Sequence, residues 1–394
     1  MKTLLSNDGR YLVVEQDTDQ NLVVYEQATM RPVWDRFSHE RLGGRIQEPH
    51  PPFVPPAVHV PKPPPSTLRP IQVTSAADGV VVNRIYSYYA NAFKDADGTI
   101  FIFAGTTDGP RFHLIRPGEG ASAWRPMMPY GGETENWYWT RDGRICLPVG
   151  PRLLSVDPFT GDERVLIDIS QSHPGCDLWQ AHSSDDGLTH SATVRRIVSE
   201  GPYPKLGTII SRSDGVTWGY LYSMYAAIQP LDESQISPDG KFVVIKEGDD
   251  NRIIEVATGQ ERWIRDTAGA VGHSDIGWPA ILVGEDNITG VCVLYDLDKK
   301  NYGGGGTDLF DTWNLGHLAI RGDLCIRSDA TNISRVNLQT GEQTILLAHG
   351  MVPPAGPHDP YDFQCRANLS PDGSVLCWMS NNGTDRFDVF VAEL

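Results

Sequence analysis

Short runs in which hydrophobic and polar residues alternate fill most of the chain, and glycine or proline ends nearly every run. The stretch SPDGKFVVIK at residues 237–246 shows the unit, a turn followed by a strand, and SPDGSVLCWM at residues 370–379 repeats it. Alternation with a period of two is typical of β-strands, and Gly and Pro mark turns. Helical spacing is nearly absent, so the pattern predicts an all-β fold.

The turn-and-strand unit recurs at a regular interval. Anchored on the glycine of each turn, successive units lie 45, 44, 53, 38, 44 and 51 residues apart. The seven anchors are Gly98, Gly143, Gly187, Gly240, a less regular position at Trp278, Gly322 and Gly373. Units of about 45 residues with four strands each are typical of β-propellers, in which neighbouring blades cover each other's faces. The sequence therefore predicts a seven-bladed β-propeller over residues 68–394.

The last unit is one strand short. After Gly373 the chain offers only VLCWMS and RFDVFVAEL before residue 394. A ring left in this state would expose a strand edge, which β-proteins avoid. We therefore expect residues 68–87 to supply the missing strand and to close the ring.

A proline-rich stretch separates the predicted propeller from the N-terminal residues. Nine prolines fall within residues 48–66, which is typical of an extended spacer that joins no sheet. We assign residues 48–67 to this linker and residues 1–47 to a small β module with three strands and two turns. A lone three-stranded sheet is weakly stable, so we expect three chains to combine their modules into a trimer.

The N-terminal module carries a partial sugar-binding motif. Asp19, Asn21, Val23 and Tyr25 fall in the register of the pattern QxDxNxVxY, while Asp17 stands where that pattern has Gln. The stretch resembles one repeat of the bulb-type mannose-binding lectins. The resemblance covers about 30 residues, which is one repeat, whereas a full lectin domain of this family contains several such repeats.

Composition narrows the choice of partners. Lys and Arg number 33 against 50 Asp and Glu, which gives a net charge of −17 and disfavours nucleic acid or anionic membranes as partners. No run approaches the ~18 apolar residues of a membrane helix, and Ser6-Asn7-Asp8 interrupts the first apolar run, unlike in a signal peptide. Six cysteines without CxxC spacing predict buried, reduced thiols. We expect synthesis in a cytoplasm.

The position five residues before each anchor is predicted to face the propeller axis on the first strand of each blade. These residues are Phe93, Tyr138, His182, Gln235, His273, His317 and Asn368. Three of the seven are histidines in a chain with only 11. Polar side chains that bind channel water are one interpretation. A Mn or Zn site made by His182, Gln235, His273 and His317 is a second, and acid–base catalysis is a third.

The third interpretation has a counterpart among known proteins. A propeller with histidines near its axis resembles the oligogalacturonate and ulvan lyases, which break uronate polysaccharides by β-elimination. That reaction needs a cation to neutralise the carboxylate, a base for the C5 proton and an acid for the leaving oxygen. The candidates in this sequence are His182 as base, Tyr138 as acid and Arg366 as cation; Tyr89 is a second tyrosine that could take part in acid–base catalysis. The negative net charge opposes an anionic polymer unless the entrance is locally basic.

Two further stretches carry weaker signals. GGETENWYW at residues 131–139 offers Trp137 for stacking on a sugar, although alternating aromatic residues also suit a buried strand. His190 falls on the expected second strand of its blade, farther from the axis than His182. No serine nucleophile elbow is present in the sequence.

The predicted architecture joins a docking module, a stiff spacer and a large ligand-binding head. It resembles bacteriophage tail-fibre and receptor-binding proteins, which act in the virion. Our first hypothesis is therefore a virion adhesion protein that contacts other virion proteins through its module and binds a host-surface glycan. The candidate ligand residues are Gln235, His273, His317, Asn368 and Trp137. The second hypothesis is a polysaccharide lyase, and the third is an intracellular scaffold.

Overall fold

The computed structural model divides the chain into two compact units, Met1–Lys62 and Pro63–Leu394. In the first unit it describes only the backbone of four strands. In the second unit it describes residues 68–81, 88–131, 134–199, 204–212, 217–222, 231–247, 250–264, 271–286, 290–299, 306–311, 316–353 and 363–394. The predicted linker, residues 48–67, lies outside the described residues.

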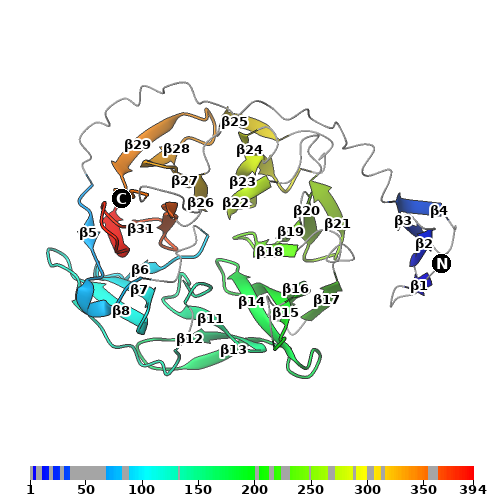
Figure 1. The fold of residues 1–394 in the computed structure, drawn as a ribbon, viewed down its shortest axis with the longest axis horizontal. Coiled ribbons are helices and arrows are strands. Elements are labelled where there is room, and N and C mark those ends of the chain that lie inside the picture. The colour runs from blue at the N-terminus through cyan, green and yellow to red at the C-terminus, as the bar shows by residue number, and fades with distance from the viewer. Residues whose placement is uncertain are drawn as a thin grey trace. The chain divides into compact units, whose positions relative to one another are not determined.

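The second unit is a seven-bladed β-propeller (Figure 1), as the repeat predicts. Seven four-stranded antiparallel sheets follow one another around a central axis, and in six of them the strands pair in chain order. Each blade begins with its innermost strand. The only helix among the described residues is the short 3-10 turn η1 (Ala76–Asp78).

The first four blades follow chain order. Blade 1 consists of β6 (Ala92–Lys94), β7 (Ile100–Thr106), β8 (Gly109–Ile115) and β9 (Ser122–Ala123). Blade 2 consists of β10 (Tyr138–Trp139), β11 (Ile145–Val149), β12 (Arg152–Val156) and β13 (Glu163–Asp168). Blade 3 consists of β14 (Cys176–Ser183), β15 (Thr189–Arg196), β16 (Lys205–Arg212) and β17 (Thr217–Tyr222). Blade 4 consists of β18 (Leu231–Ile236), β19 (Phe242–Glu247), β20 (Asp250–Glu255) and β21 (Glu261–Ile264).

The last three blades complete the ring. Blade 5 consists of β22 (Val271–Gly277), β23 (Ile281–Asp286), β24 (Val291–Asp296) and β25 (Thr307–Asp311). Blade 6 consists of β26 (His317–Arg321), β27 (Leu324–Ser328), β28 (Asn332–Val336) and β29 (Gln343–Ala348). Blade 7 consists of β30 (Asn368–Leu369), β31 (Val375–Ser380), β32 (Asp388–Glu393) and β5 (Ile71–Gln72).

The ring closes with a strand from the start of the propeller unit, as predicted. In β5, Ile71 pairs with Val391 and Gln72 pairs with Phe390 of β32. Beyond the strand, the Thr74 hydroxyl donates a hydrogen bond to Asp388 Oδ1 over 2.8 Å. Closure therefore joins the two ends of the unit and covers the edge that β32 would otherwise expose.

The hydrophobic core is divided among the interfaces between consecutive blades. Side chains from blades 7 and 1, for example, form one buried cluster that includes Ala92, Ile102, Cys377 and Val391. All six cysteines are buried free thiols, as the sequence predicts. Because each blade is covered on both faces by its neighbours, the closed ring buries its apolar strands with few exposed edges.

The N-terminal unit differs from its prediction in strand number. It contains a four-stranded antiparallel sheet of β1 (Thr3–Leu5), β2 (Tyr11–Gln16), β3 (Asn21–Glu26) and β4 (Arg31–Asp35), whereas the sequence predicted three strands. The extra strand, β1, pairs antiparallel with β2, with Leu4 opposite Val13 and Leu5 opposite Leu12. The side chains of the lectin-like motif lie outside the described residues. No helix in the described residues is long and apolar enough to span a membrane.

Candidate functional site at the propeller axis

The turns between the first and second strands explain why the residue five positions before each anchor lies on the first strand. The anchor glycines have positive φ, for example 70° at Gly240 and 76° at Gly373, a conformation that other residues rarely adopt. In the SPDG turns the serine hydroxyl donates to the following aspartate, as in Ser237 Oγ to Asp239 Oδ1 over 2.7 Å. The fixed turn sets the distance from glycine to strand. All seven predicted positions lie on the first strands β6, β10, β14, β18, β22, β26 and β30.

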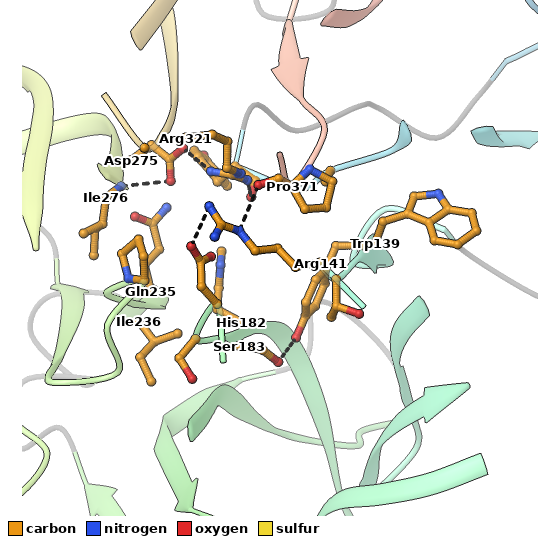
Figure 2. A pocket seen from close by; sticks show the side chains of 18 residues that line it. Trp139, Arg141, His182, Ser183, Gln235, Ile236, Asp275, Ile276, Arg321 and Pro371 are labelled. Carbon is orange, nitrogen blue, oxygen red and sulfur yellow. Dashed lines mark hydrogen bonds and ion pairs between the residues drawn. The ribbon is translucent and has the colours of Figure 1, made fainter. Parts of the chain in front are cut away.

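A cavity of about 70 Å³, here called the axial pocket, opens among these first strands and their turns (Figure 2). It is lined by residues from blades 2 to 7 together with Tyr88 and Ala90, which precede β6. Tyr138, His182 and Gln235 line it, as the sequence predicts. Arg141, Asp185, Pro238 and Pro371 also line it, and each stands two residues before a turn glycine.

His182 is held as a neutral imidazole in this pocket. Its ring stacks on Tyr89, with centroids 4.8 Å apart and planes inclined by 25°. Burial, followed by the nearby charges of Lys246 and Arg321, lowers the pKa of His182 well below 6.5. Its Nε2 is buried and has no hydrogen-bond partner among the described residues. A neutral imidazole with an unused nitrogen has the properties of a general base.

Tyr138 belongs to a chain of hydrogen bonds. Its hydroxyl lies 2.7 Å from Ser183 Oγ, and Ser183 Oγ lies 2.8 Å from His190 Nδ1. Burial raises the pKa of Tyr138 well above 10 and lowers the pKa of His190 to about 4. Tyr138 is therefore a neutral phenol and His190 a neutral imidazole near pH 7. His190 lies on the second strand β15, as predicted, and does not itself line the pocket, whereas its β14 pairing partner Ser183 does.

Two arginines supply positive charge to the pocket. Arg141 Nη2 lies 3.1 Å from Asp185 Oδ2, and Arg141 Nε donates to Pro371 O over 3.3 Å. Arg321 Nη1 lies 3.0 Å from Asp275 Oδ2, and Arg321 Nη2 donates to Tyr88 O over 2.8 Å. Figure 2 shows both guanidinium groups at the centre of the view.

The two arginines differ in what they can still bind. The Arg141 side chain is 48% exposed, and its Nη1 has no hydrogen-bond partner among the described residues. The Arg321 side chain is 17% exposed and bonds three groups through its two terminal nitrogens. Because a guanidinium carries donors suited to a carboxylate, Arg141 is the better placed of the two to bind a ligand carboxylate.

A buried polar network surrounds Gln235 on the blade 4 side of the pocket. Gln235 Nε2 donates to Glu233 Oε1 over 3.0 Å and to Ser274 O over 3.1 Å. Lys246 forms an ion pair with Glu233 and lies 4.7 Å from the centre of the Tyr88 ring. Since its amide nitrogen already has two partners, Gln235 serves chiefly to fix the network.

The other two predicted histidines form a separate pair. His273 and His317 have ring centroids 4.4 Å apart, and neither lines the axial pocket. His317 is fully buried and its Nε2 lies 2.7 Å from Gln364 Oε1. Burial, then His273 and Arg366, lowers the pKa of His317 well below 6.5. Arg366 is also fully buried and does not line the pocket, whereas Arg141 does.

The remaining predicted residues are engaged in packing. Asn368 Nδ2 donates to Asn91 Oδ1 over 3.0 Å, which joins blade 7 to the residues before blade 1. Phe93 stacks on Trp139 with centroids 5.2 Å apart. Trp137 is 2% exposed and packs beside Phe103 in the core between blades 1 and 2. Neither Asn368 nor Trp137 lines the axial pocket.

The four predicted metal ligands are divided between two places. His182 and Gln235 line the axial pocket, whereas His273 and His317 form the separate pair. No group of three or more His, Cys, Asp or Glu side chains suited to hold an ion occurs in the part of the chain that the structure describes. Binding of Mn or Zn stays a prediction from the sequence.

Sequence reasoning missed Ser183, Arg141 and Arg321. A signal for Arg141 was present, because counting back two residues from each turn glycine selects four residues that line the pocket. Ser183 follows His182 and shares its strand. Arg321 reaches the pocket from the end of β26, which no spacing rule selects.

Comparison with known proteins supports the fold. No family model matches the chain, and no curated protein matches its sequence. An oligogalacturonate lyase from Vibrio parahaemolyticus superimposes with a TM-score of 0.58 at 12% identity, over 83% of this chain and 97% of that chain. A virginiamycin B lyase from Staphylococcus aureus gives a TM-score of 0.48 at 12% identity, over 83% of this chain and 99% of that chain. At such identities the likeness concerns the fold alone, a seven-bladed β-propeller.

Proposed function

We propose that the protein is a carbohydrate lyase that cleaves a uronate-containing oligosaccharide by β-elimination in the axial pocket. One observation carries the proposal: a neutral imidazole, a phenol and a guanidinium with unused donors line a single cavity. His182, Tyr138 and Arg141 are those residues. The oligogalacturonate lyase with the same fold is consistent with this chemistry.

Each group has a defined task in the reaction. Arg141 binds the C5 carboxylate and neutralises its charge, which makes the C5 proton more acidic. His182 accepts that proton at a ring nitrogen, because burial keeps its imidazole unprotonated near pH 7. The C5 electrons form the C4–C5 double bond as the C4–O bond breaks, and Tyr138 donates its proton to the leaving oxygen. Ser183 and His190 fix the Tyr138 hydroxyl through their hydrogen bonds.

The pocket size restricts how the substrate lies. A cavity of about 70 Å³ is several times smaller than the roughly 300–1,000 Å³ of a typical ligand pocket. A carboxylate and the adjoining C5 atom fit within it, whereas the rest of the sugar chain lies outside. The proposal therefore favours a substrate that presents one uronate to the pocket and leaves its other rings on the surface.

The test is the appearance of the product's double bond. We expect ultraviolet absorbance to rise when the protein is incubated with oligogalacturonate, oligoglucuronate or ulvan fragments. Tyr138→Phe keeps the ring that stacks on Tyr89, with centroids 5.8 Å apart, and removes the acid, so turnover should fall by about a hundredfold. Tyr130→Phe is the matched control, because Tyr130 bonds Glu163 away from the pocket.

Two results would contradict the lyase proposal. One is the absence of unsaturated product across the whole substrate panel. The other is unchanged turnover in Tyr138→Phe. Glycan binding without cleavage would favour the adhesion hypothesis, in which a virion protein binds and releases a host-surface glycan intact.

A further inference from the structure

The turn between β22 and β23 carries an unusually exposed tryptophan next to the axial pocket. Trp278 is 53% exposed, and among the described large aromatic side chains only Phe159, at 42%, is also classed as exposed. Asp275 and Ile276, which lie just before this turn, line the pocket. An exposed Trp is costly for solubility and is common where a ligand or partner binds.

The backbone of this turn is fixed to the turns on both sides. Trp278 N donates to Gly322 O over 3.3 Å, and Asp239 N donates to Pro279 O over 3.4 Å. Gly322 itself lines the axial pocket, as does Pro238 beside Asp239. The turn of blade 5 is thus held between two neighbouring turns that form the pocket wall.

Gly277 brings the turn close to blade 6. A Cβ at this position would lie 2.4 Å from Ile320 Cδ1 and 3.2 Å from the backbone oxygen of Gly322, so Ile320 would have to move. The absence of a side chain lets the β22–β23 turn rest directly against β26. The backbone that carries Trp278 is therefore held against the neighbouring turns, so a ligand that packs on the indole has little backbone to order.

We infer that Trp278 forms a sugar-binding subsite at the edge of the axial pocket, where its indole stacks on a pyranose ring next to the uronate that enters the pocket. The ligand class rests on the proposed function. The pocket holds only the carboxylate end of one sugar, so the adjoining ring must lie on the surface beside it. A rigid indole offers that ring a broad apolar face with negative electrostatic potential, which attracts the C–H groups of a pyranose.

The test compares a monosaccharide with a trisaccharide. We expect Trp278→Ala to weaken binding of tri-galacturonate by about tenfold, the size of one aromatic contact. Binding of galacturonate alone should change much less, because that ligand occupies only the pocket. Affinities are measured by calorimetry on Tyr138→Phe protein, in which cleavage is slow. Phe159→Ala is the matched control, since Phe159 is the other exposed aromatic residue and lies on the β12–β13 turn.

The outcomes separate this inference from the lyase proposal. Unsaturated product together with an unchanged tri-galacturonate affinity in Trp278→Ala would overturn the subsite and leave the lyase. Weaker trisaccharide binding in Trp278→Ala without product from the wild-type protein would support the subsite and contradict the lyase. Failure of the wild-type protein to bind tri-galacturonate would overturn the subsite.

Discussion

Two histidine environments occur along the same set of first strands. His182 lies in the axial pocket, stacked on Tyr89, with a buried Nε2 that bonds no described residue. His273 and His317 pack against each other, and His317 is fully buried with Gln364 as partner. All three come from the same position in the repeat. The difference shows that a repeat position fixes where the backbone lies, whereas the neighbours decide whether its side chain meets ligand or core.

The difference between the two environments follows from the residues that surround each histidine. The Tyr88–Tyr89 segment supplies aromatic faces and backbone oxygen atoms on the pocket side. On the other side, Gln364 and the buried guanidinium of Arg366 occupy the space around His317. Under the lyase proposal, the first environment serves catalysis and the second serves stability. Four predictions test this division.

The largest expected effect is on catalysis at His182. His182→Asn removes the base and keeps a polar side chain of similar reach, so elimination should slow by about 100- to 10,000-fold. The melting temperature should change little. Turnover is measured from the product's ultraviolet absorbance. The control is His173→Gln, because His173 is a half-buried histidine that does not line the pocket. Turnover within threefold of the wild-type value would exclude His182 as the base.

The next effect is on folding at His317. His317→Ala leaves a cavity and removes the partner of Gln364 Oε1, so the free energy of unfolding should fall by about 3 kcal/mol. Turnover per folded molecule should stay within a few-fold of normal. Urea denaturation and the lyase assay measure the two quantities. A stable His317→Ala protein without activity would place this pair in the reaction instead.

A smaller effect concerns pH. The pKa of His190 is about 4 in the folded state against 6.5 ordinarily, so between these values the unfolded chain binds more protons. The contribution of His190 to the free energy of unfolding is therefore fully present above pH 6.5 and is lost as the pH falls. Between pH 7 and pH 5 this loss is about 2 kcal/mol from His190 alone. The lowered pKa values of His182 and His317 act in the same direction.

The His190 contribution can be isolated by substitution. His190→Gln should reduce the loss of stability between pH 7 and pH 5, measured by urea denaturation of the variant and of the wild-type protein at each pH. An identical pH dependence in His190→Gln and the wild-type protein would show that His190 does not titrate as described.

The smallest effect is expected at Ser183. Ser183→Ala removes the hydrogen bonds to Tyr138 and His190, each worth about 1 kcal/mol, so turnover should fall by roughly five- to tenfold. Ser172→Ala, at an exposed serine that bonds His173, is the control. A loss as large as that of Tyr138→Phe would instead give Ser183 a direct part in the reaction.

Several features of the fold were predictable from sequence because they are local. Each SPDG-type turn fixes its own backbone through a positive-φ glycine and a serine–aspartate hydrogen bond. Repetition of these turns then predicts the blade number and the seven inward positions. The missing last strand predicts closure by residues near 71, because a ring cannot leave its final sheet incomplete. The N-terminal strand count was wrong because short strands leave a weak alternating signal.

The sequence by itself determined the all-β class, the seven blades, the buried cysteines and the placement of Tyr138, His182 and Gln235 at the axis. Tertiary structure alone decided that Arg141 supplies the accessible guanidinium, that Ser183 and His190 hold Tyr138, and that Trp137 and Arg366 are buried away from the pocket. The physical reason is range. Turn geometry and alternation depend on neighbours in sequence, whereas the burial, charge and partners of a side chain depend on residues brought together from different blades.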